Sequence, residues 1–209
     1  MTKSELSRFV VTLIRRSLII LAISSALSAC VSAASAPMPT ATPNPPGWII
    51  DWLKNPVCTP PCWQGIQPGV TSKDSVEDIQ RQFPDMSLET RRGTSIVQLI
   101  SLNLPMDDHL PIGLIVSKYG QPSYVRLYKC DPNARCETHI VFPDLGMALD
   151  AYPDNIGAGG HNAVRLSDNT SIFRIYLLEP GIASYHASFN GGPDEGLIRW
   201  TGYHEYSNP

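Results

Sequence analysis

Four of the five cysteines form two closely spaced pairs, and their spacing limits the chemistry that they could perform. Cys58 and Cys62 enclose two prolines in the stretch CTPPCWQGIQPG, whereas Cys130 and Cys136 enclose the turn-forming stretch DPNAR. The first pair does not have the two-residue gap of thioredoxin-like redox centres, and its prolines disfavour the helix start that lowers the pKa of a thiol. We therefore predict structural cysteines rather than catalytic ones.

These four cysteines are expected to form disulfides if the chain is exported, because oxidising compartments favour disulfides. Local spacing favours the pairs Cys58–Cys62 and Cys130–Cys136, the second of which would join the strands of a hairpin. Pairing between the two sites stays open, since four cysteines allow three connectivities. A zinc site would need all four as thiolates, which the same compartment disfavours, so no metal site is predicted.

Glycine, serine and aspartate residues suggest an alternative, catalytic function. The stretch GAGGH at 157–161 offers backbone N–H groups that could bind an oxyanion, and Ser167 and Asp168 follow it. Asp150 and Asp154 could be the paired acids of a glycoside hydrolase. This alternative is an extracytoplasmic hydrolase with a site near the glycine-rich loop 155–162.

For each of these groups a structural role is the better interpretation: a flexible loop for the glycines, and strand ends for Asp150 and Asp154. The acidic residues beside His109 are expected to cap a helix. No histidine spacing matches a chelating motif such as HExxH, so we predict no catalytic residue, no metal ligand and no cofactor. The five histidines are His109, His139, His161, His186 and His204.

The amino terminus predicts where the protein resides. A basic segment precedes an apolar run at 17–29 that is too short for a comfortable membrane span, as in a signal peptide. The run ends in LSAC, which resembles the bacterial lipobox; in chains with that motif the cysteine thiol receives a diacylglycerol and the chain is cut before it. We therefore expect Cys30 to carry the lipid, palmitate or a similar acyl chain. The alternatives are ordinary cleavage after AASA at 33–36 and an uncleaved anchor helix.

Three parts of the chain are predicted on this basis. Residues 1–29 are a lipoprotein signal peptide, residues 30–46 are the lipidated cysteine with a tether, and residues 47–209 are a single folded domain. The tether consists of small residues and prolines without charge, so it cannot bury enough surface to fold. The domain is expected at the cell membrane or outer envelope, facing away from the cytoplasm.

The charge of the chain limits its partners. The formal net charge is −3, and it becomes −6 without the four basic residues and one acidic residue of segment 1–29. No basic stripe is visible, which disfavours nucleic acid as a partner. The expected partners are the membrane, through the lipid anchor, and other proteins of the envelope.

Periodicity predicts an α+β domain in which two main helices pack on an antiparallel meander. Apolar spacing indicates helices at 47–55, from about 71 to 83, and at 110–122, with Leu110 and Leu114 on the buried face of the last one. Alternating or β-branched stretches indicate the strands, and the glycine-rich tail after residue 180 is expected to pack over an edge of the sheet. The strands are expected at 94–104, 123–130, 137–143, 145–153 and 171–180.

Two segments of this domain carry a resemblance to known families. GIQPGVTSKDSVEDI and SKYGQPSYV, followed by the turn in FPDLGMAL, resemble the SmpA/OmlA-like domains of envelope lipoproteins. In that family a single helix carries both signatures, whereas here they fall on two helices about fifty residues apart. The chain also resembles bacterial lipoproteins with a PCWxGIxPG segment. The resemblance implies an envelope lipoprotein that binds partners, and it agrees with a non-enzymatic binding module as the predicted function.

Overall fold

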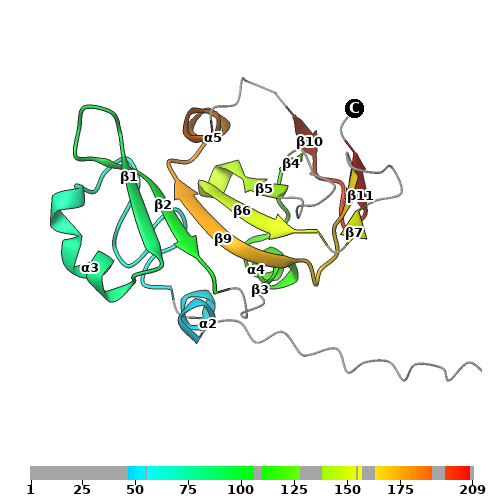
Figure 1. The fold of residues 1–209 in the computed structure, drawn as a ribbon, viewed down its shortest axis with the longest axis horizontal. Helices are drawn as coiled ribbons and strands as arrows, with labels where there is room; N and C mark the ends of the chain where they lie inside the picture. The colour runs from blue at the N-terminus through cyan, green and yellow to red at the C-terminus, as the bar shows by residue number, and fades with distance from the viewer. Residues whose placement is uncertain are drawn as a thin grey trace, which may run out of the picture. The chain divides into compact units, whose positions relative to one another are not determined.

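The computed structural model describes residues 47–54, 56–105, 110–127, 138–153, 155–156, 163–189 and 196–207, all within one compact unit of the chain. These residues form an α+β fold with a large antiparallel sheet, as predicted (Figure 1). No described helix is long and apolar enough to cross a membrane. The helices are α2 (Gly47–Lys54), α3 (Glu77–Gln82), α4 (Ile112–Tyr119) and α5 (Ile182–Ser188), with 3-10 turns η2 (Lys73–Ser75) and η3 (Pro143–Leu145).

The large sheet has eight strands, and its order along the sheet is β1-β2-β9-β6-β5-β4-β10, with β3 also paired to β9. Strand β9 follows β2 by some seventy residues in the chain and nevertheless lies between β2 and β6. The strands are β1 (Met86–Thr90), β2 (Val97–Asn103), β3 (Leu110–Pro111), β4 (Tyr124–Leu127), β5 (Thr138–Phe142), β6 (Met147–Tyr152), β9 (Ser171–Leu178) and β10 (Leu197–Arg199).

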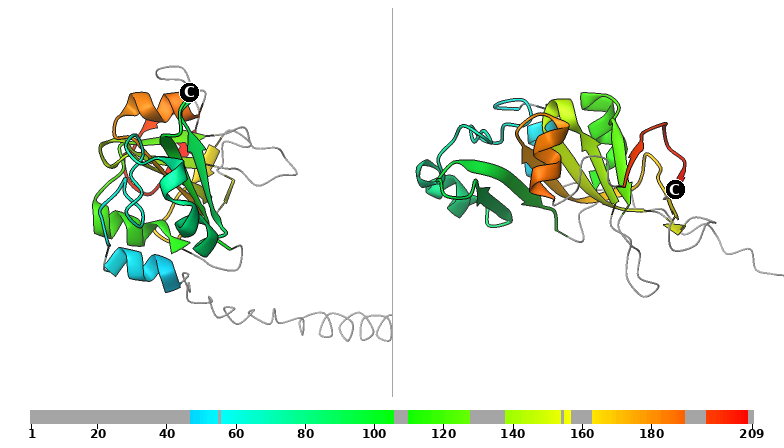
Figure 2. Two further views of the ribbon diagram at one scale, coloured as in Figure 1. Left: turned by 90° about the vertical axis from the view of Figure 1, so that its left-hand side faces the viewer. Right: turned by 90° about the horizontal axis from the view of Figure 1, so that it is seen from above.

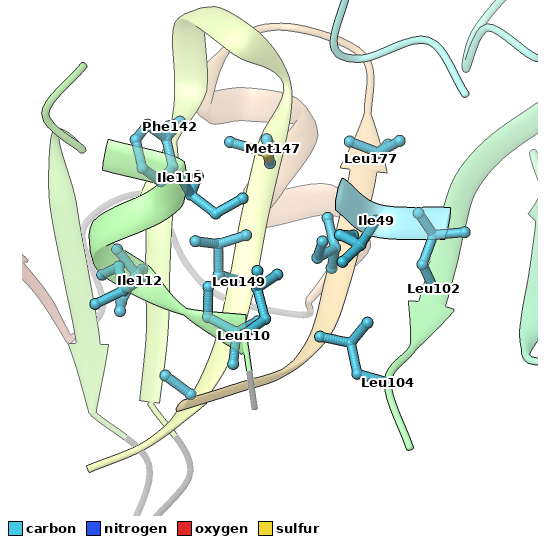
Figure 3. Close-up of a cluster of buried hydrophobic side chains, with 14 of the residues drawn as sticks. Ile49, Leu102, Leu104, Leu110, Ile112, Ile115, Phe142, Met147, Leu149 and Leu177 are labelled. Carbon is cyan, nitrogen blue, oxygen red and sulfur yellow. The ribbon is translucent and has the colours of Figure 1, made fainter. Parts of the chain in front are cut away.

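The larger part of the hydrophobic core lies on the face of the sheet that α2 and α4 cover. Ile49 of α2 and Ile112 and Ile115 of α4 are completely buried against strand residues such as Leu149 and Leu177 (Figure 3). The apolar side chains of α2 recur on one side because they are three or four residues apart, which explains why the segment forms an amphipathic helix. Each such fully buried side chain contributes about 1.5–3 kcal/mol.

Helix α5 covers the opposite face of the sheet. Its Tyr185 is buried among Leu99, Val141, Ala148 and Leu178, whose neighbours in the strands point to the other face. Figure 2 shows α5 and α2 at opposite ends of the left-hand view. The sheet is therefore buried on both faces, which explains why β5 and β6 read as nearly continuous apolar sequence.

A second, three-stranded sheet follows the order β11-β8-β7 and is formed by Asn155–Ile156 (β7), Ala163–Arg165 (β8) and Glu205–Ser207 (β11). Tyr206 of β11 is buried and stacks on Trp200, so the tail is packed by its aromatic residues. The tail is predicted to pack over an edge of the sheet, but its strand β10 instead pairs with β4 and extends that edge. The prediction of a loop at 155–162 is wrong for its first two residues, which form β7.

Two predicted helices differ from the structure in a way that tertiary hydrogen bonds explain. The helix expected over 71–83 is divided into η2 and α3, and the Lys73 N–H donates to the Ser95 carbonyl, which ties the first turn to the connection between β1 and β2. The helix expected at 110–122 begins only at Ile112, because Leu110 pairs with β9. The buried face is therefore shifted, and Leu114 is exposed. Its predicted end at Gly120 is confirmed by a left-handed φ of 88°.

Candidate binding site

Three tryptophans from two segments form an aromatic cluster beside the large sheet. Helix α2 places Trp48 and Trp52 one turn apart, and both ring systems meet Trp63 edge-to-face, with centroids 5.1 and 5.5 Å away. Phe83, just after α3, makes a similar contact with Trp63 at 5.8 Å. Such pairs add about 0.5–1.5 kcal/mol to the energy of burial. Helix α2, which apolar spacing predicts over 47–55, therefore docks on the domain through its tryptophans.

The disulfide loop before Trp63 positions its side chain. Cys58 and Cys62 are joined by a disulfide, which is the local pairing, and Cys130 and Cys136 lie outside the described residues. After Cys62 the chain makes a tight turn in which Trp63 and Ile66 exchange both backbone hydrogen bonds, at 2.9 and 2.7 Å. Both side chains consequently point into the core, where Trp63 is 1% exposed.

A pocket of about 220 Å³ opens beside this cluster, and we call it the aromatic pocket. Three aromatic rings contribute to its wall, and Trp63 is the most buried of them, so it forms the base. A pocket of this size accepts one small group rather than a drug-sized ligand. It is lined by Trp48, Trp63, Gln82, Phe83, Pro84, Asp85, Met86, Leu102 and Asn103.

The rim of the aromatic pocket is polar and carries a single charge. Asp85 and Gln82 are exposed, and no Lys or Arg is found among the described lining residues. The backbone carbonyl of Asp85 accepts hydrogen bonds from the N–H and the side-chain amide of Asn103, at 3.0 and 3.1 Å, which fixes the start of β1 against the end of β2. The carboxylate of Asp85 makes no ion pair or hydrogen bond within the described part of the chain.

A second group of polar residues lies on the α5 face of the sheet. Strand register places Asn103, Arg174, Asp150, His139 and Arg126 directly opposite one another on β2, β9, β6, β5 and β4. Paired residues of antiparallel strands point to the same face, so these five form one row across the sheet. We call them the polar row.

Asp150 is the centre of the polar row. Its Oδ2 accepts a hydrogen bond of 2.9 Å from the Tyr176 hydroxyl, which in turn accepts one of 2.8 Å from Arg174. Its Oδ1 is in contact with Nε2 of His139. The other ring nitrogen of His139 shares a hydrogen bond of 2.8 Å with the Tyr185 hydroxyl.

These groups are buried, which determines what they can do. His139 is 3% exposed and Asp150 is 1% exposed, so a substrate cannot reach the contact between them. Burial raises the pKa of Tyr176 to about 12, the largest cause being the loss of contact with water. The phenol therefore stays neutral and keeps donating to Asp150. The network joins β5, β6 and β9 to α5 and has the features of a structural element.

Asp150 corrects one of the sequence predictions. It lies in the interior of β6 and not at a strand end, because its burial is compensated by Tyr176, Arg174 and His139. Its predicted partner Asp154 lies outside the described residues. The pattern that could have revealed the contact between His139 and Asp150 is one histidine and one aspartate in two mostly apolar strands, THIVF and MALDAY.

The remaining predicted site residues are not brought together in the described structure. Ser167 and Asp168 form a turn closed by a hydrogen bond from the Ser167 N–H to the Thr170 hydroxyl, and the Asp168 carbonyl accepts from Gly113. Cys30, His109 and the segment 157–162 lie outside the described ranges. Within those ranges, no three His, Cys, Asp or Glu side chains are arranged to hold a metal ion.

Comparison with protein-family models, with curated proteins and with solved structures found no match for this chain. The candidate site is therefore inferred from its geometry alone. Sequence reasoning predicted the helix that carries Trp48 and Trp52, but it did not identify the aromatic pocket. The pocket combines residues from α2, the disulfide loop, the end of α3 and two strands, and no local pattern joins these segments.

Proposed function

We propose that this protein is a lipid-anchored binding module on the outer side of the membrane, held there through Cys30 and presented by the tether 31–46. The lipobox-like sequence and the absence of charge in the tether support the anchoring. The observation that supports binding is the aromatic pocket, in which apolar walls meet a polar rim whose side chains Gln82 and Asp85 are exposed. Its occupant would be a partner or another component of the envelope.

A binding function agrees better with the titratable groups than a hydrolytic one. The histidine–carboxylate contact between His139 and Asp150 is buried beneath α5 and is used to connect strands. The polar side chains that line the aromatic pocket are one carboxylate, Asp85, and two amides, Gln82 and Asn103, which orient a ligand but do not form a nucleophile–base pair.

The test is site-specific photo-crosslinking in cells that make the full chain. A photo-reactive residue replaces Gln82 at the rim of the aromatic pocket, and a matched one replaces Lys118, which is exposed on α4 and does not line the pocket. We expect a discrete adduct from position 82 and none from position 118. Equal labelling from the two positions, or none from either, would refute the proposed site.

A further inference from the structure

The residues that line the aromatic pocket limit the class of ligand that it can bind. The inference drawn from them rests on the proposed function. Trp48 and Phe83 are half-buried, and their rings stand nearly perpendicular to that of Trp63, with interplanar angles of 79° and 75°. An aromatic ring attracts a cation wherever its negative π-face lines the pocket. A purely apolar ligand would pack on the same walls, so only the residues of the rim distinguish a cation from an apolar ligand.

The rim favours a positive charge. Asp85 is exposed, its carboxylate makes no ion pair with a described residue, and the described lining contains neither Lys nor Arg. A neutral ligand gains at most a hydrogen bond from this carboxylate, whereas a cation gains charge–charge attraction to it and attraction to the rings.

The interior of the pocket then distinguishes between kinds of cation. A primary ammonium is strongly hydrated and carries three N–H donors that need acceptors. Met86 and Leu102, which are both buried, are apolar and supply no such acceptor. A quaternary ammonium has no N–H donor, and its methyl groups pack on aromatic and aliphatic walls alike. A volume of about 220 Å³ suits one such head.

We infer that the aromatic pocket binds a small soluble ligand with a trimethylammonium group, whose charge is balanced by Asp85. The rings of Trp48, Trp63 and Phe83 surround the methyl groups, and the rest of the ligand extends past Gln82 into solvent. No covalent step is involved, so the site recognises and releases its ligand unchanged.

The experiment compares choline with 3,3-dimethylbutan-1-ol, its neutral isostere, by titrating the full chain and following the indole N–H signals in NMR spectra. Trp48 and Trp63 are expected to shift with choline, and Trp200, which packs on Tyr203 and Tyr206 instead, is the internal control. We expect choline to bind about tenfold more tightly than the alcohol. Asp85→Asn should remove most of this preference, whereas Asp74→Asn, an exposed acid that does not line the pocket, should not.

The outcomes separate this inference from the proposed function. Equal affinity for choline and the neutral alcohol would overturn the assignment of a cation, while the pocket would remain a binding site. No shift with either ligand at millimolar concentration, together with a specific adduct at position 82, would overturn the small-ligand assignment alone. Absence of both the NMR shifts and the adduct would overturn the small-ligand assignment and the proposed binding function.

Discussion

Replacement of Asp150 by Asn tests the role of the buried polar row. The substitution keeps the size and one oxygen acceptor of the side chain but removes the charge that faces His139, Tyr176 and Arg174. Because Asp150 is 1% exposed and His139 is 3% exposed, the imidazole would lose a partner that water cannot replace. Removing one member of a buried pair costs about 3–5 kcal/mol, against a total stability of about 5–15 kcal/mol for a typical domain.

The assay is urea-induced unfolding of the purified protein, followed by tryptophan fluorescence at pH 7. Asp144→Asn is the matched control, because Asp144 is exposed in the turn η3, and its effect should stay within about 0.5 kcal/mol. A double-mutant cycle with Tyr176→Phe gives the coupling between the two side chains, which share a hydrogen bond of 2.9 Å. We expect a coupling energy of about 1 kcal/mol or more.

Two results would refute this reasoning. If Asp150→Asn costs no more than Asp144→Asn, the carboxylate does not stabilise the row. If the effects of Asp150→Asn and Tyr176→Phe add within about 0.5 kcal/mol, the two side chains do not act together.

Three further predictions follow from the same structure. Since the pKa of Tyr176 is raised to about 12 from 10, the contribution of its neutral phenol to stability is complete below pH 10 and is lost as pH rises towards 12. Urea unfolding should therefore show the stability difference between the wild type and Tyr176→Phe shrink by about 2–3 kcal/mol over that range. A constant difference would contradict this prediction. Joint replacement of Cys58 and Cys62 by Ser should lower the free energy of unfolding by about 2 kcal/mol, the value expected for so short a disulfide loop. No change would mean that the hydrogen-bonded turn at Trp63 and Ile66 holds this segment in place without the disulfide. Cys30→Ser should move the protein from the membrane fraction to the soluble fraction after cell lysis, and unchanged membrane retention would count against lipid anchoring.

The parts of the fold that sequence predicts are those specified by neighbouring residues. The spacing of Trp48, Ile49 and Trp52 determines a helical face, and Gly120 ends a helix because it adopts a positive φ. Strands β5 and β6 form a hairpin, and the turn that connects them ends at Gly146, which adopts the left-handed conformation. The class of the fold, an antiparallel sheet with helices, follows from such local elements.

The parts that sequence does not predict depend on contacts between distant segments. Strand β9 lies between β2 and β6, and its mostly apolar sequence would satisfy many strand orders. The contact of His139 with Asp150 depends on the register of β5 against β6, which neither residue reveals alone. Helix α5 was missed because its segment contains serine, histidine and a preceding glycine, all of which have weak helix propensity.

The central claim, a membrane-anchored module that binds through its aromatic pocket, is tested most directly by the adduct from position 82 in cells that make the full chain. The measurement compares the chain with an otherwise identical one carrying Trp48→Leu, which removes one wall of the pocket but keeps an apolar residue on α2. Both chains are first matched for folding by urea unfolding. The account predicts a specific adduct that is lost or several-fold weaker with Trp48→Leu. An adduct of equal yield from both folded chains would contradict it.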